Sequence, residues 1–339
     1  MSGTEFETLA GLLDRHGLAG TPEEPFPNDG WSGARMTLLR RPGGGQYVLK
    51  RDSLARNWIA RSTADGPIPR EAWFAARGPL LPAPIRAPYL GAGVDGDEYG
   101  ILMPDMSGWL FNWQWPISVE VLDHHAGGLA AFHGYPWVGS GELVGAPSGP
   151  IRERITLICR ASLEAPGPAR DAVGERILPG WDAFDRQAPA DVRALIHGLG
   201  SDPARLVAAL GAMPMTLLHG DLKLANVGIA PDGSIDLVDW QMVMVGPVSI
   251  ELGWFIVSNV ASLPMPPDEV LDRYRVAAGL GGIDWQRQVD GAVLVGLLLR
   301  GWRKGADAEA GVVHASGVSG ADDLAWWCER ALEAADRLL

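Results

Sequence analysis

The feature that most constrains the chain is a short polar run, His219-Gly-Asp221-Leu-Lys-Leu-Ala-Asn226, followed thirteen residues later by Asp239-Trp240. The Asp221 carboxylate can accept the proton of a hydroxyl group, and Asn226 and Asp239 offer the oxygen ligands that Mg²⁺ prefers. Phosphoryl transfer from a nucleotide requires little more from protein side chains, because positioning and charge neutralisation provide most of the catalysis. The order and spacing of these residues therefore predict a phosphotransferase site.

The residues between Asn226 and Asp239 have the pattern of a β-hairpin. Two β-prone runs, 227–230 and 234–240, flank the turn sequence Pro231-Asp-Gly233. A hairpin would bring Asn226 and Asp239 together at its open end, where two metal ligands must meet. The alternative is a His-Gly-Asp turn beside an ordinary surface hairpin. Each residue alone fits that alternative, but the joint spacing favours the catalytic interpretation.

The segment 219–254 resembles the aminoglycoside phosphotransferase and choline kinase-like family, in which a His-Gly-Asp loop is followed by Asn and then by a strand ending in Asp-Trp. The resemblance implies an α+β, bilobal protein kinase-like fold. Its N-lobe is a small antiparallel β-sheet with one main helix, and its larger C-lobe is mainly helical. The resemblance also implies that Asp221 is the catalytic base, that Asn226 and Asp239 hold Mg²⁺, and that ATP or GTP donates the phosphate.

The sequence departs from the family pattern at two positions. Lys223 lies where the family often has His, and Glu251 lies where it usually has a second Asp. Lys223 resembles the lysine of the protein-kinase loop that faces the transferred phosphate, which makes it a second catalytic candidate beside Asp221. A solvated loop lysine is the alternative.

The resemblance requires an upstream lysine on the nucleotide phosphates and an acid to hold it. Residues 46–50 form a β-prone run that ends in Lys50 and follows the turn sequence 42–45. Glu71 follows Pro69 among helix-forming residues and is the candidate partner. The alternatives are an exposed lysine at the end of a strand and a first-turn glutamate favoured by the helix dipole. The catalytic loop predicts such a pair in this order, which favours the functional interpretation.

Two further segments are candidates for nucleotide contacts. Ser32 and Gly33 end the run 28–33, which precedes a β-prone stretch and would take the place of a glycine-rich phosphate loop. Residues 99–106 read as an apolar strand that stops at a proline. We expect it to be the edge strand of the sheet and the linker between lobes, with backbone groups near Met103 and Asp105 meeting a purine edge.

These assignments place the N-lobe at residues 1–102, the hinge at 103–106 and the C-lobe at 107–339. The C-lobe contains the catalytic loop, 219–226, and the metal-binding hairpin, 227–241. Residues 165–168 read as an exposed connection. Helical periodicity predicts helices at residues 119–133, 151–163, 202–210, 247–259, 267–280, 290–304 and 321–338.

Several C-lobe side chains are candidates for binding the acceptor or a metal ion. The candidates for stacking on an acceptor are Trp109, Trp113, Trp115, Trp326 and Trp327, although core packing explains most tryptophans equally well. The candidates for binding amino groups of the acceptor are Asp322, Asp323 and Glu329. A metal site at His124, His125 and His133 is disfavoured, because no carboxylate or cysteine cluster accompanies them, and structural histidines are the preferred interpretation.

Composition narrows the class of protein. The net charge of −13 argues against nucleic-acid binding, which needs a basic surface, and would suit a cationic substrate. The two cysteines give neither a metal spacing nor a disulfide framework, and the first residues lack the pattern of an export signal. The apolar run 291–299 is too short to span a membrane. We therefore expect a cytoplasmic protein that is a monomer or a homodimer and binds no nucleic acid and no membrane.

The predicted function is Mg²⁺-dependent transfer of the γ-phosphate of ATP or GTP to a hydroxyl of a small molecule. The composition, rich in Gly and Ala with Arg in place of Lys, is typical of high-GC bacteria that make and resist antibiotics. The predicted acceptor is therefore an aminoglycoside-like or other antibiotic. The alternatives are a sugar, amino-sugar or choline-type kinase of metabolism, a pseudokinase that binds nucleotide without turnover, and an unrelated helical binding protein.

Overall fold

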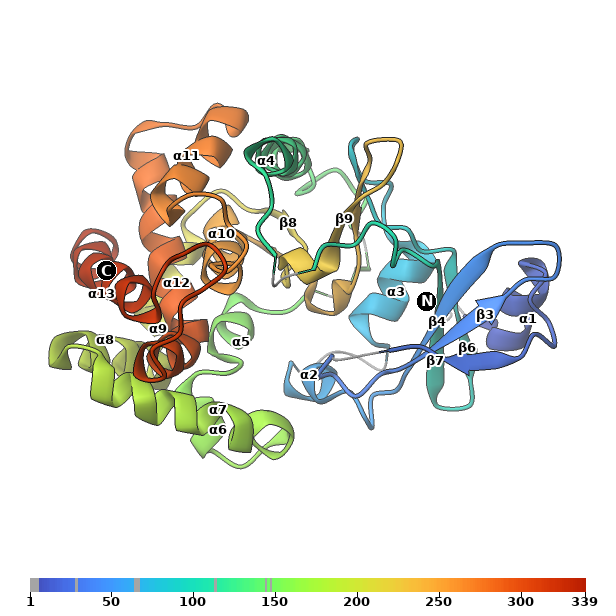
Figure 1. Cartoon of the computed structure of the whole chain (residues 1–339), viewed down its shortest axis with the longest axis horizontal. Coiled ribbons are helices and arrows are strands. Elements are labelled where there is room, and N and C mark those ends of the chain that lie inside the picture. Colours follow the sequence, from blue (N-terminus) through green and yellow to red (C-terminus); the bar gives the residue numbers. More distant parts are fainter. Residues whose placement is uncertain (1–5, 28–29, 64–67, 113–114, 144, 147) are drawn as a thin grey trace.

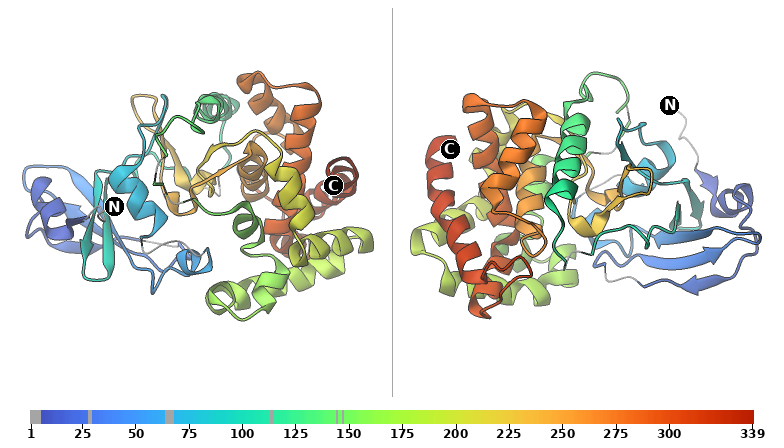
Figure 2. Two further views of the ribbon diagram at one scale, coloured as in Figure 1. Left: turned by 180° about the vertical axis from the view of Figure 1, so that it is seen from behind. Right: turned by 45° about the horizontal axis from the view of Figure 1, so that its top comes forward.

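The computed structural model describes residues 6–27, 30–63, 68–112, 115–143, 145–146 and 148–339. The chain forms two lobes, one built around a sheet and the other built from helices (Figure 1). The hairpin that follows the polar run lies between them. A second view separates the strands on one side of the molecule from the helices on the other (Figure 2). The predicted α+β, bilobal arrangement is confirmed.

The first lobe contains a six-stranded sheet in the order β1-β6-β7-β4-β3-β2. Its strands are β1 (Glu7–Thr8), β2 (Glu23–Pro25), β3 (Arg35–Arg40), β4 (Gln46–Asp52), β6 (Gly91–Asp95) and β7 (Glu98–Pro104). All neighbouring pairs are antiparallel except β1 and β6. The turn before Lys50 joins β3 to β4 as an antiparallel hairpin.

The position predicted for residues 99–106 was wrong. The strand β7 lies between β6 and β4 and is central in the sheet, not an edge strand. The sequence analysis did not anticipate β6, which forms a tight hairpin with β7 through the turn at Gly96. Ile101 packs in a cluster with Ala72 of one helix, and Leu102 packs in a cluster with Leu9 and Leu12 of another, so both side chains are buried.

Three helices belong to this lobe: α1 (Leu9–Arg15), α2 (Trp58–Ser62) and α3 (Arg70–Arg77). The helix α3 begins after Pro69, whose fixed backbone angle suits a helix start. It packs against β6, β7 and the short helix η2 (Trp240–Met242). Phe74 stacks on Trp240 with ring centroids 4.1 Å apart, which orients the first turn of α3 and its Glu71.

The second lobe is mainly helical. Its helices are α4 (Val119–Gly134), α5 (Ile151–Thr156), α6 (Arg160–Glu164), α7 (Pro168–Gln187), α8 (Ala190–Ser201), α9 (Ala204–Gly211), α10 (Val248–Ser258), α11 (Pro267–Ala278), α12 (Gly282–Glu309) and α13 (Gly320–Leu338). The helix α12 lies at the centre and contacts α7, α10 and α13. Residues 292–299 of α12 are almost completely buried, as the apolar run predicted.

Three helix predictions need correction. Residues 151–163 form two helices, because Cys159 takes an extended conformation and caps α6. The long helices α7 and α8 were not among the predicted helices, and residues 165–168 were predicted as an exposed connection. Pro168 lies at the first helical position, where proline is tolerated, and Pro179 lies inside α7. The helix α12 runs from Gly282 to Glu309 and is much longer than predicted.

Two small sheets hold the hairpin. The strands β9 (Val227–Ile229) and β10 (Ile235–Leu237) pair antiparallel, as predicted, and β10 also pairs with β5 (Ile85–Arg86). The strand β8 (Thr216–Leu218) pairs with β11 (Met244–Gly246). Pairing of β8 with β11 and of β9 with β10 brings the segments before and after the polar run close to those before and after Asp239. Trp109 and Arg86 secure the hairpin by bonding to the buried Asp236.

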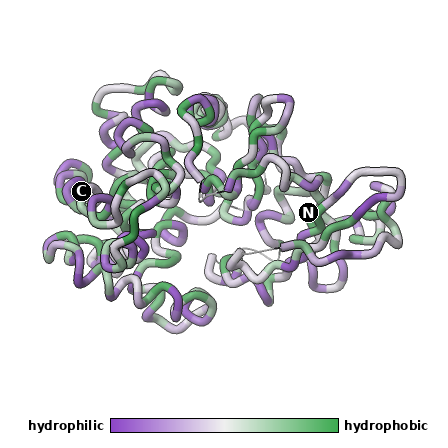
Figure 3. The backbone as a smooth tube through the Cα atoms, viewed as in Figure 1, coloured by the Kyte–Doolittle hydropathy of each residue, from purple (hydrophilic) through white to green (hydrophobic). Residues whose placement is uncertain are grey.

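None of the helices described is long and apolar enough to cross a membrane. Colouring the backbone by hydropathy shows polar and apolar residues interleaved along the helices (Figure 3).

The buried ring of His125 in α4 makes folding sensitive to acid. The ring packs on Phe255, and neither of its nitrogens has a partner within the described ranges. Burial lowers the pKa of His125 to about 4. The unfolded ring takes up a proton below about pH 6.5 whereas the folded ring does not. The part of the unfolding free energy that depends on His125 is therefore fully present above about pH 6.5 and is lost as the pH falls toward about 4.

We expect this group to cost on the order of 3 kcal/mol of unfolding free energy at acid pH, since one pKa unit corresponds to about 1.4 kcal/mol. Urea unfolding of the wild type and of His125→Phe, measured at about pH 7 and about pH 4.5, tests the expectation. The variant should lose less stability on acidification. An equal loss in both proteins would show that His125 is not responsible.

Candidate active site

The ring of His219 fixes the start of the catalytic loop. The Asp221 N–H donates to its Nδ1 at 3.2 Å, so Nε2 carries the proton and donates to the carbonyl of Val238 at 2.9 Å. Burial lowers the pKa of His219 and keeps the ring neutral. One imidazole therefore connects the loop to the end of β10.

Glu251 anchors the same loop from α10. Its Oε1 accepts the Gly220 N–H at 2.7 Å, and its Oε2 accepts the His219 N–H at 3.0 Å and lies 3.0 Å from His133 Nε2. The carboxylate is completely buried, yet its pKa is lowered because the bonds to His133 and the loop outweigh the effect of burial. The sequence analysis noted Glu251 only as a departure from the family pattern. Its anchoring role could not be derived without the contact between α10 and the loop.

Replacing Glu251 by Gln should weaken both the fold and the site. The amide keeps one acceptor, so at least one of the two loop N–H groups loses its partner in a buried place. We expect the unfolding free energy to fall by about 3 kcal/mol and kcat to fall more than the nucleotide KM changes. Urea unfolding and steady-state kinetics measure these effects. Glu333→Gln, which changes an exposed ion pair with Arg337, should leave both unchanged. Equal behaviour of the two variants would contradict the anchoring role.

Asp221 lies buried in this loop beside two predicted partners. Its Oδ2 accepts from Asn226 Nδ2 at 3.1 Å and from Lys223 Nζ at 3.1 Å. The Asn226 amide also donates to the Asp221 carbonyl at 2.9 Å, which turns its Oδ1 away from Asp221. The Lys223 side chain is 39% exposed, so water screens its ion pair in part. Both groups hold one carboxylate oxygen, and the other oxygen is the one that can meet a hydroxyl.

Lys50 on β4 joins Glu71 and Asp239. Its ammonium lies 2.6 Å from Glu71 Oε2 and 2.7 Å from Asp239 Oδ1. Burial opposes the charge of Lys50, but the two carboxylates outweigh it and hold the pKa of the ammonium above its ordinary value. The structure thus brings together the predicted pair Lys50 and Glu71 and joins it to the predicted metal ligand.

Tyr89 completes this cluster and was missed by the sequence analysis. Its hydroxyl donates to Glu71 Oε1 at 2.8 Å and accepts the Asp239 N–H at 3.0 Å. It therefore bridges α3 and the end of the hairpin. Tyr89 precedes β6 without any motif, so the sequence carries no signal for it.

The residues present fit a hard divalent cation. Asp239 has φ 68° and ψ 53°, a left-handed conformation that non-glycine residues adopt rarely. This conformation turns the chain sharply after β10, and Gln241 Nε2 donates to Asp239 Oδ2 at 3.0 Å. The Val238 N–H donates to the Asn226 carbonyl at 3.0 Å, so Asn226 and Asp239 lie close together, as predicted. One carboxylate and one amide oxygen suit Mg²⁺, which takes its remaining ligands from phosphates and water.

Among the described residues, no hydrogen bond or ion pair joins the other nucleotide candidates to this cluster, which leaves their role a prediction. Ser32 and Gly33 lie in the loop between β2 and β3, where an added Cβ on Gly33 would lie 3.2 Å from the carbonyl of Arg56. Residues 28 and 29 of the predicted loop lie outside the described residues. At the other end of β4, the Asp105 N–H donates to the Gln46 carbonyl at 2.9 Å, and the Met103 side chain is buried.

The predicted acceptor contacts on α13 also lie elsewhere. Asp323 pairs with the buried Lys304 at 2.6 Å, Asp322 is bonded to Ser319 at the start of the helix, and Trp327 lies in the core. Near the hinge, Trp109 bonds to Asp236 and Trp115 is exposed, whereas Trp113 lies outside the described residues. These side chains have structural roles or no contact with Asp221.

The histidines of α4 likewise have partners that are not metal ligands. His124 Nε2 lies 2.8 Å from the Gly233 carbonyl, and His133 lies between Glu251 and Tyr274. Across the described part of the chain, no three or more His, Cys, Asp or Glu side chains group as a metal site.

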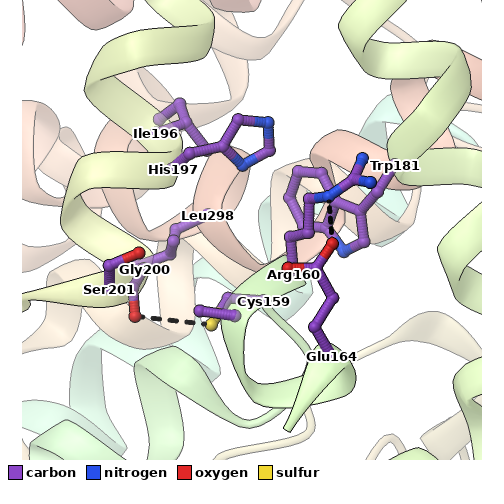
Figure 4. Close-up of a pocket in the computed structure, with 10 residues that line it drawn as sticks. Cys159, Arg160, Glu164, Trp181, Ile196, His197, Gly200, Ser201 and Leu298 are labelled. Carbon is purple, nitrogen blue, oxygen red and sulfur yellow. Dashed lines mark hydrogen bonds and ion pairs between the residues drawn. The ribbon is translucent and has the colours of Figure 1, made fainter.

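A small cavity of about 60 Å³ lies between α6, α7, α8 and α12 (Figure 4). Cys159 lines it, with its Sγ 3.7 Å from the Gly200 carbonyl, and Arg160 and Glu164 pair at its edge. None of the residues of the polar run or the hairpin lines it. The cavity is therefore separate from the candidate site.

A sequence profile of the phosphotransferase enzyme family matches residues 25–288, a span that contains Lys50, Glu71, Asp221, Asp239 and Glu251. The chain belongs to this family. No curated protein matches this phosphotransferase in sequence.

Solved structures are similar to this phosphotransferase over nearly the whole chain. The choline kinase from Cryptosporidium parvum Iowa II has 9% identity, with 97% of this chain and 96% of that chain covered and a TM-score of 0.55. A spectinomycin phosphotransferase, in complex with ADP and spectinomycin, has 14% identity, with 96% and 93% covered and a TM-score of 0.52. An aminoglycoside phosphotransferase from Alicyclobacillus acidocaldarius has 16% identity, with 95% and 93% covered and a TM-score of 0.47. The first two likenesses establish the protein kinase-like fold.

Proposed function

We propose that the protein transfers the γ-phosphate of ATP or GTP to a hydroxyl group of a small molecule in a Mg²⁺-dependent reaction. The observation that carries the proposal is the convergence of Lys50, Asp239, Asn226 and Asp221 at the open end of one hairpin. A binding module has no need of a buried carboxylate placed next to the metal ligands. Their joint presence therefore disfavours a pseudokinase.

Each side chain has one role in this proposal. Lys50, held by Glu71, binds the nucleotide phosphates, and Asn226 and Asp239 are the Mg²⁺ ligands. The bound cation would neutralise charge on the β- and γ-phosphates. Asp221 orients the acceptor hydroxyl and takes its proton as the new oxygen–phosphorus bond forms and the bond to the departing ADP or GDP breaks. Lys223 offsets the charge of the phosphoryl group.

The base of the nucleotide would meet the chain beyond β7. Residues along an antiparallel strand point their backbone groups alternately to the two sides, and the Asp105 N–H is already bonded to β4. We therefore place the base against the Pro104 carbonyl and the Met106 N–H, next to the predicted Met103 and Asp105. Ser32 and Gly33 would cover the phosphates from the loop between β2 and β3.

The acceptor predicted from the sequence is an aminoglycoside-like or other antibiotic, with sugars, amino sugars and choline-like alcohols as alternatives. The family resemblance supports all of these acceptors equally, because the motifs bind nucleotide and metal and do not contact the acceptor.

Nucleotide turnover tests the proposal. Release of ADP or GDP by the purified protein should require Mg²⁺, stop on addition of EDTA, and be lost in Asp239→Asn. Asp232→Asn changes an exposed carboxylate of the same hairpin and should keep the activity. Release that continues in EDTA, or that survives in Asp239→Asn, would overturn the proposed metal site.

A further inference from the structure

Three arginine and three tryptophan side chains form a continuous stack that ends beside Asp221. Its successive members are Arg176, Trp31, Trp302, Arg300, Trp254 and Arg154. The centre of each guanidinium lies 4.7 to 5.4 Å from the centroid of the ring it covers, and the two tryptophan rings in contact have centroids 6.5 Å apart. The four guanidinium-to-ring distances lie within the range of cation–π attraction. We call this set the Arg–Trp stack.

The Arg–Trp stack connects five separate parts of the chain. Trp31 comes from the loop between β2 and β3, where Trp58 of α2 donates to its carbonyl at 2.8 Å. The other members come from α5, α7, α10 and α12. At the far end, Arg154 Nε donates to the Gly220 carbonyl at 2.8 Å. The stack therefore runs from the proposed phosphate loop to the residue that precedes Asp221.

The stack contains buried donors for which the described residues provide no acceptor. They are Arg154 Nη2, Arg300 Nε, Trp254 Nε1 and Trp302 Nε1. Arg154, Trp254 and Trp302 are each less than 7% exposed. Guanidinium and indole nitrogens can only donate, so an acceptor for these four groups has to come from a bound molecule or from water. Four such donors in one stack favour a ligand that is rich in acceptors.

The local charge at the stack is positive, although the chain as a whole carries −13. Burial lowers the pKa of Arg154 and of Arg300 to about 10, and nearby Asp221 opposes this effect in both. Other acids near the stack are engaged: Asp307 pairs with Arg303 at 2.9 Å, and Glu251 holds the catalytic loop. A polycationic acceptor would meet two guanidinium groups here, whereas Asp307 and Glu251 are already engaged.

Space is available next to the stack. A groove of about 370 Å³ lies along α7 and α12 and is lined by Trp302, Arg176 and Arg303, among others. Its charged lining residues are Arg176, Arg303 and Glu309, so the positive charges outnumber the negative one beside the stack.

We propose that the acceptor carries an oxyanion, a carboxylate or a phosphate, which Arg154 and Arg300 bind so that a neighbouring hydroxyl meets Asp221. Arg forms two parallel hydrogen bonds to such a group, which fixes orientation as well as charge. The inference rests on the proposed phosphotransferase function and narrows its acceptor. Among antibiotics it selects hydroxylated acids over polycationic aminoglycosides, and among metabolites it selects hydroxy acids and sugar phosphates over choline-like alcohols.

Sugars matched in size and different in charge test this proposal. The probes are D-gluconate, D-glucose 6-phosphate, D-glucose and D-glucosamine, each titrated by calorimetry into the full chain saturated with Mg²⁺ and ADP, so that the nucleotide site is closed to them. We expect gluconate, glucose 6-phosphate or both to bind at least about tenfold tighter than glucose, and glucosamine to bind no tighter than glucose. A preference for one of the two oxyanions identifies it as carboxylate or phosphate.

Three variants on α12 separate ligand binding from packing. Arg300→Gln should lose the oxyanion preference by about tenfold, and Arg300→Lys, which keeps the charge, should retain part of it. Arg287→Gln removes the same charge roughly 20 Å away along the helix and should bind as the wild type does. The wild-type titrations stand on their own if a variant fails to fold.

Equal binding of the four sugars, tighter binding of glucosamine, or no binding of either oxyanion sugar would overturn the proposal. A preference that persists unchanged in Arg300→Gln would also overturn it. Failure of the proposed phosphotransferase function would be distinguishable, because Mg²⁺-dependent nucleotide turnover would then be absent regardless of how the four probes bind.

Discussion

Replacing Asp221 by Asn is expected to reduce kcat on the order of 10²-fold or more. The amide has almost the same shape, so Asn226 and Lys223 can keep their bonds to its oxygen, but an amide cannot take the proton of the acceptor hydroxyl. Nucleotide affinity should change little, because Lys50 and Asp239 are untouched. Steady-state kinetics and a separate titration with nucleotide measure the two quantities.

Asp232→Asn is the matched control for this prediction. It makes the same chemical change at an exposed turn of the same hairpin, where the carboxylate pairs with Arg86. Its kcat should match that of the wild type. Near wild-type turnover by Asp221→Asn, or a similar loss in both variants, would rule out Asp221 as the base.

Replacing Gly220 by Ala is expected to lower the unfolding free energy by at least about 4 kcal/mol. Gly220 has φ +82°, and an added Cβ would lie 1.9 Å from the carbonyl oxygen of Met242. Both sides of this contact are backbone, held by Glu251 on one side and by the pairing of β8 with β11 on the other. The chain cannot relieve the clash without moving the catalytic loop.

Gly233→Ala separates the clash from the backbone angle. Gly233 has the same φ of +82°, but no atom lies within 4 Å of an added Cβ. This variant should lose only the cost of the left-handed conformation, about 1 to 2 kcal/mol. Urea unfolding followed by tryptophan fluorescence compares the two. Equal losses would show that the contact with Met242 is not rigid and that the loop tolerates a side chain.

The sequence predicted the parts of the site that depend on local spacing. The hairpin signal in Pro231-Asp-Gly233 places Asn226 and Asp239 side by side. The strand that carries Lys50 and the helix that begins before Glu71 meet as expected. Short-range patterns suffice for these residues because turn chemistry and helix starts are decided by neighbours in the chain.

The residues that were missed act through contacts between distant segments. Tyr89 bonds across 150 positions to Asp239, and Arg154 reaches Gly220 from α5. Neither lies in a motif, and periodicity carries no information about such pairs. The same limit explains why the tryptophans of α13 were considered for the acceptor, whereas Trp254 and Trp302 lie in the stack beside Asp221.

Identification of a phosphorylated acceptor is the most direct test of the proposed phosphoryl transfer. The purified protein would be incubated with Mg²⁺, ATP or GTP, and mixed acceptors that include hydroxylated acids, sugar phosphates, aminoglycosides, nucleoside antibiotics and choline-like alcohols. Mass spectrometry would then search for an acceptor that has gained a phosphoryl group, with Asp221→Asn as control. We expect one class of acceptor, bearing an oxyanion, to be phosphorylated by the wild type and not by the control. A phosphorylated product formed equally by the Asp221→Asn variant would contradict it.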